Sequence, residues 1–553
     1  MVEIINKVLS PIQTWQDFNP NSDDLEISIL NCYVQNDITY TELIFTAQEK
    51  EDGKIRVYCM IARKKELREN SPVILVIPGV NGMPEDEILN SVVEDGFVYV
   101  TFDYAGRGEK RTEYPGSVSY GYFDSIENII EVKGSPKNTP WYLWAMICRR
   151  VITVVAQQYN EPPICLAGVN LGANIGWMVA GMDGRVSCFV SINGSGYIET
   201  MKSYYKPVIA DEYPTSWTAG LAPQSYVKYI NCPVLYVGGT NNVYSNLDKA
   251  QDLLANVSSE DKYQTLCPNA EGSITADAFD SIKAWLYRFF VGDKTSILDT
   301  QVSFKNSDGK LYALVKVLEK NVDKIRIFIA EKETLPNIRE WQKITQFTTL
   351  NNGECILPLN IESVNDKIYC FANTYYNDGM ILASKVIGIV PAEIGILKEN
   401  LPQKIPSRIV YNSSMGNYYF FGKNNSFIFD RKLITKKAGA FGISGIGLEG
   451  GGSLYTFNVG DQKFRDNVNA GLQMDAYTLK DVTIEIIVYS QEEELIPYSV
   501  RVYLKGCEQW QQINLNPNDF KNYEMISLDS YSSIKKIEFK NIDDVLFNNI
   551  LWV

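Results

Sequence analysis

Short, wholly apolar runs alternate with segments of helical spacing between positions 72 and 290. The apolar runs are PVILVIPG, FVYVTFDY, ICLAGV, VSCFVSI and CPVLYVGG. Runs of this length are typical of strands buried on both faces of a parallel sheet. The segments between them include WYLWAMICRRVITVVAQQY and DAFDSIKAWLYRFF, which place apolar residues at helical spacing. Strands that alternate with helices predict an α/β fold with a mostly parallel sheet, which we expect to end near Asp293.

The rest of the chain has the pattern of antiparallel sheets. Before position 66, runs such as LEISILNCYV and GKIRVYCMIA alternate apolar and polar residues, which predicts antiparallel strands ahead of the parallel part. From 295 to 391, and again from 406 to 553, short strands are separated by turns. We therefore expect an α/β domain over residues 1–293, followed by two all-β sandwiches over 295–391 and 406–553.

Charge and composition exclude several classes of protein. The 553 residues carry a net charge of −14, which repels phosphate backbones, so nucleic acid is not an expected partner. No apolar run reaches the ~18 residues of a membrane span, and the first twenty residues lack the pattern of a signal peptide. We expect a cytoplasmic protein with no membrane partner. The ten cysteines are scattered singly, which predicts buried reduced thiols and neither a metal nor a cofactor.

The chain contains no histidine. This absence excludes catalysis by a serine–histidine–acid triad and by a cysteine–histidine pair. It also excludes zinc sites built on imidazole ligands.

The stretch ICLAGVNLGANIGWMVAG, Ile164 to Gly181, combines an apolar strand, a Gly-x-x-x-Gly turn and a helix of small residues. In a nucleophile elbow, the same turn lifts a serine above the sheet. Here the central position is Asn170, whose amide has no ionisable proton and is a negligible nucleophile.

Residues 1–293 resemble the α/β-hydrolase superfamily, in particular the acetyl-xylan esterase, cephalosporin-C deacetylase and dienelactone-hydrolase-like proteins. The resemblance rests on five segments in family order: VILVIPGVNG, FDYAGRGE, TPWYLWAMICRR, the elbow, and CPVLYVGGTNN. It implies an α/β-hydrolase fold. It also implies a catalytic serine at the elbow, an aspartate after a late strand and a histidine before the last helix.

None of the three implied catalytic residues is present. The serine position is Asn170, the aspartate position falls on Asn241 or Asn242, and the histidine position falls on Ala270 or Glu271. We therefore expect a catalytically degenerate domain, a pseudoenzyme.

The turn that would stabilise an oxyanion remains. Its amides imply a ligand pocket lined by Val80, Asn81, Asn170 and Leu171. The alternative is that the glycines of the elbow persist because strand and helix pack closely there.

Two weaker resemblances concern the all-β regions. NIREWQKI and CFANTYYNDGMILAS resemble immunoglobulin- or fibronectin-like modules, which implies a spacer or docking role for 295–391. WQQINLNPNDFKNY and IKKIEFKNIDDVLFNNILWV resemble the closing half of a galactose-binding-like jelly-roll, a carbohydrate-binding module.

These features predict a structural or interaction protein that assembles with itself into homo-oligomers or a larger assembly. We expect the terminal run VLFNNILWV to offer an open strand edge, with Lys535, Lys536 and Lys540 protecting a neighbouring edge. The first alternative is a carbohydrate-binding protein that uses the C-terminal sandwich. The second is a carbohydrate esterase with displaced catalytic residues.

Overall fold

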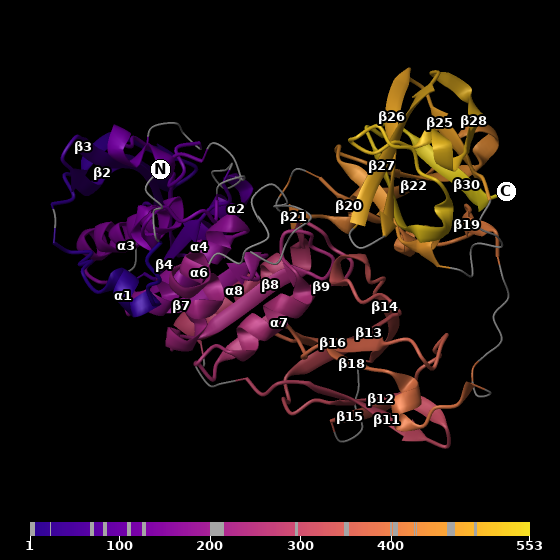
Figure 1. Cartoon of the computed structure of the whole chain (residues 1–553), viewed down its shortest axis with the longest axis horizontal. Helices are drawn as coiled ribbons and strands as arrows, with labels where there is room; N and C mark the ends of the chain where they lie inside the picture. The colour runs from indigo at the N-terminus through magenta and orange to yellow at the C-terminus, as the bar shows by residue number, and fades with distance from the viewer. Residues whose placement is uncertain are drawn as a thin grey trace.

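The computed structural model describes most of the chain, and the statements that follow concern that part. The described residues are 6–22, 24–66, 71–80, 86–107, 112–123, 129–198, 215–292, 297–347, 353–398, 401, 407–424, 426, 428–461, 470–491 and 495–553. Figure 1 shows an α/β body followed by two all-β parts. Within the described residues, no helix combines the length and apolarity needed to cross a bilayer.

A nine-stranded mixed sheet forms the α/β body, in the order β1-β2-β3-β5-β4-β6-β7-β8-β9. The strands β1 to β3 pair antiparallel, and β5, β4 and β6 to β9 run parallel to one another. This large mixed sheet agrees with the predicted α/β-hydrolase fold. The strands are Ser28–Gln35, Ile38–Lys50, Gly53–Lys64, Val73–Ile77, Val98–Phe102, Ile164–Val169, Val186–Ile192, Val234–Gly239 and Lys262–Cys267, numbered β1 to β9.

Helices cover both faces of the sheet, which is why the parallel strands β4 to β8 consist mostly of apolar residues. Side chains of α3, α4 and α7 join one buried cluster with Val73 and Leu75, whereas α2 and α8 join a second cluster with Ile74. The described helices are α1 (Pro11–Trp15), α2 (Asp86–Glu94), α3 (Pro140–Tyr159), α4 (Leu171–Met182), α6 (Thr215–Gly220), α7 (Leu247–Ala255) and α8 (Ala276–Phe290).

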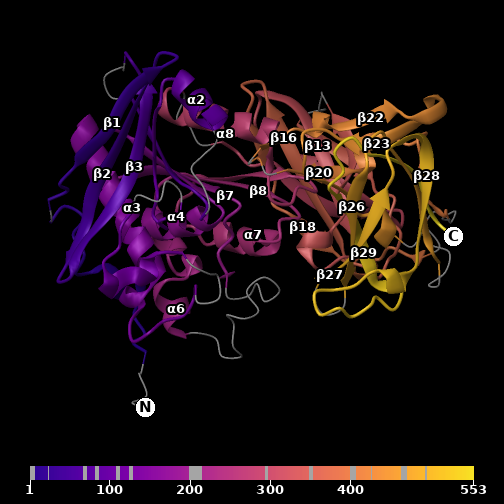
Figure 2. The ribbon, with the colours of Figure 1, turned by 90° about the horizontal axis from the view of Figure 1, so that it is seen from above.

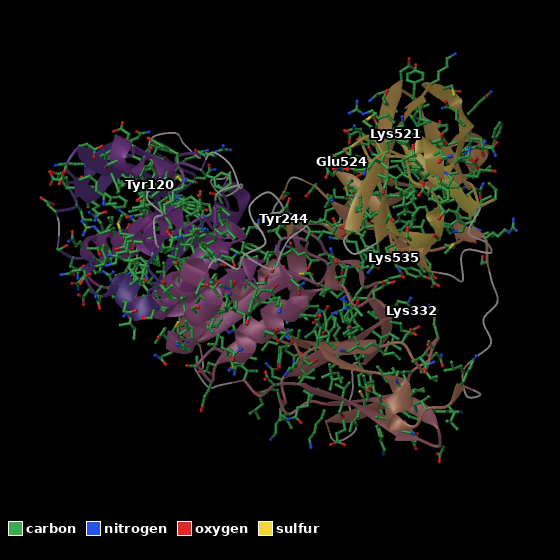
Figure 3. The ribbon with its side chains drawn as sticks, in the orientation of Figure 1. Tyr120, Tyr244, Lys332, Lys521, Glu524 and Lys535 are labelled. Atoms are coloured by element: carbon green, nitrogen blue, oxygen red, sulfur yellow. The ribbon has the colours of Figure 1, made fainter. Side chains whose placement is uncertain are left out.

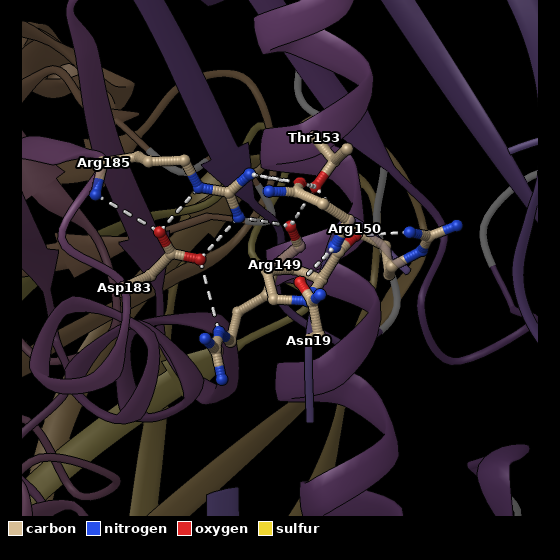
Figure 4. Close-up of polar contacts among 8 residues, drawn as sticks. Asn19, Arg149, Arg150, Thr153, Asp183 and Arg185 are labelled. Atoms are coloured by element: carbon tan, nitrogen blue, oxygen red, sulfur yellow. Dashed lines mark hydrogen bonds and ion pairs between the residues drawn. The ribbon is translucent and has the colours of Figure 1, made fainter. Parts of the chain in front are cut away.

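A buried ion pair joins α4, the helix of the elbow, to α3. Asp183 follows the last residue of α4, and its carboxylate accepts hydrogen bonds from Arg149 Nε at 3.2 Å and Arg185 Nη2 at 2.7 Å (Figure 4). Arg185 also donates to Thr153 Oγ1 on α3, at 2.9 Å. These contacts fix the far end of the helix that begins at the elbow.

The middle β region packs directly onto the α/β body. Its sheet β14-β13-β16-β17 contributes Phe328, Phe371 and Ala383 to a buried cluster of the α/β body. Thr265 on β9 donates to the carbonyl of Ile381, so β17 covers the β9 side of the large sheet. The strands are Gln301–Ser307, Lys310–Lys316, Val322–Glu331, Gln342–Phe347, Glu354–Pro358, Ile368–Tyr376, Ile381–Ala383 and Ile387–Ile389, numbered β11 to β18.

The C-terminal β region contains a six-stranded and a five-stranded sheet around a separate buried core. Figure 2 shows it at the opposite end of the molecule from β1 to β3. The six-stranded sheet holds β19 (Ile409–Tyr411), β22 (Ile434–Ala438), β23 (Ser444–Leu448), β25 (Leu472–Thr478), β28 (Cys507–Leu515) and β30 (Leu546–Trp552). The five-stranded sheet holds β20 (Phe421–Lys423), β24 (Ser453–Thr456), β26 (Val482–Gln491), β27 (Leu495–Leu504) and β29 (Ile534–Lys540).

Two expectations about strand edges are wrong. The terminal run forms β30, which pairs with β23, β25 and β19 and therefore offers no open edge. The three lysines protect no edge either, because β29 lies between β24 and β26. The apolar character of the terminal run reflects a central strand rather than an exposed one.

Candidate functional site

An asparagine follows each of four successive parallel strands. Asn170 follows β6, Asn193 follows β7, Asn241 lies two residues after β8, and Asn269 lies two residues after β9. Because the strands are parallel, all four lie along the edge of the sheet that the carboxyl ends of its strands form. This edge is where the resemblance places the triad.

Asn170 occupies the elbow in a strained backbone conformation, with φ 51° and ψ −111°. Its N–H donates to the carbonyl of Ile192 at 2.9 Å, which ties the turn to β7. A Cβ added at Gly172 would lie 2.2 Å from the carbonyl oxygen of Ile77. Close backbone packing is therefore sufficient reason for glycine at this position, whatever the chemistry of the turn.

The predicted ligand pocket is only partly described. Val80, Asn170 and Leu171 are each partly exposed, whereas Asn81 lies outside the described residues. The pocket that these residues imply stays a prediction.

The aspartate position of the triad holds a buried amide that binds the middle β region. Asn241 Nδ2 donates to the carbonyl of Arg339 at 2.8 Å and to that of Asn337 at 3.2 Å. Its neighbour Asn242 accepts a hydrogen bond from the Tyr244 N–H at 2.7 Å. Asn241 therefore joins two parts of the chain and makes no contact of the kind that orients a catalytic base.

Arg339, whose carbonyl accepts the hydrogen bond from Asn241, also joins the α/β body to the middle β region through its side chain. Arg339 is fully buried, and its guanidinium makes two hydrogen bonds to the Asp248 carboxylate, at 2.6 and 2.7 Å. The guanidinium also lies 3.7 Å from the ring centroid of Tyr369. It thus links α7 of the α/β body to the middle β region.

The histidine position lies in the loop between β9 and α8, residues 268–275, which we call the β9–α8 loop. Asn269 exchanges two hydrogen bonds with the backbone of Trp341, at 2.7 and 2.8 Å. The Asn269 carbonyl accepts from Tyr455 Oη at 2.8 Å, and Ser273 Oγ donates to the Ser426 carbonyl at 2.7 Å. The short strands β10 (Ile274–Thr275) and β21 (Ile428–Phe429) then pair in parallel. This one loop therefore contacts both β regions.

Glu271 enters a buried cluster of four charges that we call the ion cluster: Glu271, Lys423, Lys536 and Glu538. Its carboxylate pairs with Lys536 Nζ and, at 2.8 Å, with Lys423 Nζ. Glu538 pairs with the same two lysines, at 3.0 Å from Lys423 and 3.6 Å from Lys536. Tyr489 Oη donates to Glu538 at 2.6 Å. The two carboxylates and two ammonium groups balance in charge.

The environment shifts the pKa of several of these groups. Burial alone raises the pKa of Glu538, but Lys536, Lys423 and the Tyr489 hydrogen bond outweigh it and lower that pKa to about 2. Burial opposes the charge on Lys423, but Glu271 and Glu538 outweigh it and raise the pKa above its ordinary value. The charged forms of Glu538 and Lys423 are thus the stable ones at neutral pH.

This arrangement supplies no nucleophile with a base beside it. Glu271 pairs with two lysines, and the Ser273 hydroxyl donates its hydrogen bond to the Ser426 carbonyl. Cys165, the cysteine nearest the elbow in sequence, is fully buried within β6. Within the described residues, no group of three or more histidine, cysteine or acidic side chains is placed to hold a metal ion.

Sequence reasoning missed most of the polar groups at this edge. Asn193 bridges two loops, since its Oδ1 accepts from the Gly239 N–H at 3.1 Å and its Nδ2 donates to the Gly272 carbonyl at 3.0 Å. Asn269, Tyr455 and Glu538 were missed as well. The available signal was the repetition of asparagine directly after β6 and β7 and two residues after β8 and β9.

Comparisons with known proteins give likeness in structure only. No protein-family model matches the chain, and a search of curated proteins returns no match. Acetyl xylan esterase 1 from Thermoanaerobacterium sp. JW/SL YS485 is 15% identical, with a TM-score of 0.42 over 49% of this chain and 89% of that one. Acetyl xylan esterase from Paenibacillus sp. R4 is 14% identical, with a TM-score of 0.40 over 48% and 90%. Pyrococcus horikoshii acylaminoacyl peptidase is 12% identical, with a TM-score of 0.34 over 50% and 58%. At these values the likeness carries no information about activity.

Removing one lysine of the ion cluster should destabilise the fold. In Lys536→Met, two buried carboxylates share only Lys423, and we expect the free energy of unfolding to fall by about 3–5 kcal/mol. Lys540→Met, a partly exposed position on the same strand, is the matched control and should change it by less than about 1 kcal/mol. Denaturant unfolding measures both, and equal effects would contradict a structural role for the cluster.

The low pKa of Glu538 predicts acid sensitivity. Because this pKa lies below its ordinary value near 4.5, the stabilisation is complete above about pH 5 and is lost as the pH falls toward 2. The difference in unfolding free energy between wild type and Glu538→Gln should therefore shrink by on the order of 3 kcal/mol over that window. Between pH 6 and 8 the difference should be flat, since the chain has no histidine to titrate there. A difference that does not vary from pH 5 to 2 would contradict this assignment.

Proposed function

We propose that this chain is a non-catalytic protein with an α/β-hydrolase fold, a pseudoenzyme that acts as a structural or interaction protein and assembles with copies of itself. The observation that carries the proposal is that residues at the predicted triad positions join different regions of the chain. Asn241 holds the middle β region, and Glu271 holds the C-terminal β region through two lysines. Groups engaged in joining parts of the chain are not available for acid–base chemistry.

The absence of histidine and the amide at the elbow support the same proposal. Asn170 keeps the strained backbone of an elbow, but its side chain has no proton to lose at neutral pH. The close backbone packing at Gly172 explains why the turn persists without a catalytic role.

Carbohydrate binding by the C-terminal sandwich is the alternative function. The outer face of the six-stranded sheet carries Asp475 and Asn549, joined by a 2.7 Å hydrogen bond. Trp510 on β28 is poorly placed to stack on a sugar, because its ring packs against the backbone of Gly439 and Gly445. A Cβ added at Gly439 or Gly445 would lie 2.8 or 2.7 Å from this ring. A glycan-array screen separates this alternative from the proposed role.

We expect no turnover of short acyl esters. The hydrolysis rate of p-nitrophenyl acetate with native protein should equal that with heat-denatured protein, and Asn170→Ala should leave it unchanged. The reason is that no activated nucleophile lies at the elbow. Hydrolysis above the denatured control that is lost in Asn170→Ala would overturn the proposal.

Rebuilding the triad should reveal the structural duty of Glu271. We compare Asn170→Ser/Asn242→Asp/Ala270→His with the same triple variant in which Glu271→His replaces Ala270→His. Only the second removes a carboxylate from the ion cluster, so its free energy of unfolding should be lower by about 3 kcal/mol.

Thermal and denaturant unfolding of the two variants provide the comparison, and ester hydrolysis is measured on both. A Glu271→His variant that is as stable as its partner and turns over esters efficiently would show that the β9–α8 loop is a catalytic loop.

A further inference from the structure

The outermost strands of the large sheet are β1 and β9, and they differ in whether another part of the chain covers them. At one edge, β9 is covered by the middle β region, with Thr265 and Gln264 donating to the carbonyls of Ile381 and Ser384. At the other edge, β1 pairs with β2 on one side only among the described strands. All eight residues of β1 are exposed.

The sequence of β1, SILNCYVQ, has few of the features that block an open edge. It contains no charged residue and no proline, although its register against β2 shifts once, between Ile29 and Asn31. Lysine, proline and bulges are the usual means of preventing edge pairing, so only the last is present. Ile29 is 67% exposed and Val34 is 58% exposed. An eight-residue uncharged strand with exposed apolar side chains is suited to receive another strand.

We propose that β1 pairs antiparallel with β1 of a second copy, across a twofold axis, so that two nine-stranded sheets become continuous. The strand is complementary to itself in this arrangement. With full overlap, Ile29 faces Val34, Leu30 faces Tyr33, Asn31 faces Cys32 and Ser28 faces Gln35. Apolar residues meet apolar residues, and polar residues meet small or polar ones, as stable cross-strand pairs require.

Electrostatic repulsion between two copies is weaker at β1 than over the rest of the surface, because β1 carries no charge. The net charge of −14 opposes contact between copies in general, but β1 brings no acidic side chain to the junction. The neighbouring Glu26 is itself paired with Lys54 at 2.6 Å. Asn36 and Asp37, both at positive φ, turn the chain back toward β2.

The position of β1 leaves room for a whole second molecule. Figures 1 and 2 place β1 to β3 at one end of the molecule and the C-terminal β region at the other. Two copies joined at β1 therefore keep their C-terminal regions far apart. The twofold contact is isologous and closed, which predicts a dimer rather than a filament.

This inference rests on the proposed self-assembly and names its route. Sedimentation and light scattering of the full chain should give about twice 62.5 kDa at about 100 μM. Val34→Lys should weaken association by at least about tenfold, because it places a charge opposite Ile29. Val291→Lys, at a 56% exposed site that lies outside β1 and directly after α8, is the matched control and should associate as wild type does.

Charge exchange tests the register directly. Ile29→Glu alone should also be monomeric, but a mixture of Ile29→Glu with Val34→Lys should recover the dimer mass, since Glu at 29 then faces Lys at 34. Hydrogen exchange measured on unmodified protein adds a readout that needs no variant. Those amides of residues 28–35 that point away from β2 should become protected as concentration rises.

A wild-type mass of 62.5 kDa at all concentrations would overturn both the β1 contact and self-assembly. Assembly of Val34→Lys equal to that of Val291→Lys, or a mixture that stays monomeric, would overturn the β1 contact and leave self-assembly by another surface. Neither result bears on the ester assay, so failure of this inference is distinct from failure of the non-catalytic assignment.

Discussion

The ion cluster is the interaction on which the position of the C-terminal β region against the α/β body depends most. Four charges from β20, β29 and the β9–α8 loop meet there, and the side chains of Glu271, Lys536 and Glu538 are at most 4% exposed, whereas that of Lys423 is 31% exposed. Buried charges are tolerated only when each has a partner in good geometry. The C-terminal region therefore has one position against the α/β body in which both carboxylates are neutralised. The uncharged contacts around the cluster, such as the Tyr455 hydrogen bond to Asn269, depend on that position.

The sequence predicted those parts of the fold whose signal is local. The buried strands β4 to β8 could be recognised because burial on both faces requires an apolar residue at nearly every position, as in Val73 to Ile77. Strand β9 was missed, because its sequence KYQTLC carries three polar residues. The short helix α1 was missed, since five residues are too few to show a helical period. Its signal was the capping box of Ser10 and Gln13, with Pro11 at the first helical position.

The contacts between regions could not be predicted from local signals. In β29, Lys536 and Glu538 alternate with Ile537 and Phe539, which is also the pattern of a strand with one face in water. Only the tertiary structure shows that the charged face meets the β9–α8 loop. The same limit explains why the open strand edge was predicted at the wrong segment. VLFNNILWV and SILNCYVQ both predict strands, but only the strand order shows that the first lies inside its sheet and the second is an outermost strand. The triad positions stay predictions from the resemblance, and nothing in the local sequence indicated that Asn241 and Glu271 join regions of the chain.

The contact between Lys536 and Glu271 also bears on the order of events during synthesis, because 265 positions separate the two residues. At translation rates of about 5–20 residues per second, the β9–α8 loop waits on the order of tens of seconds for β29 to be made. Until β29 is made, the loop presents the Glu271 carboxylate to water, whereas the Asn269 side chain meets Trp341 of the middle β region earlier. The nascent α/β body thus has a hydrated surface at this junction until the C-terminal β region is made. A hydrated surface aggregates less readily than an exposed apolar surface would.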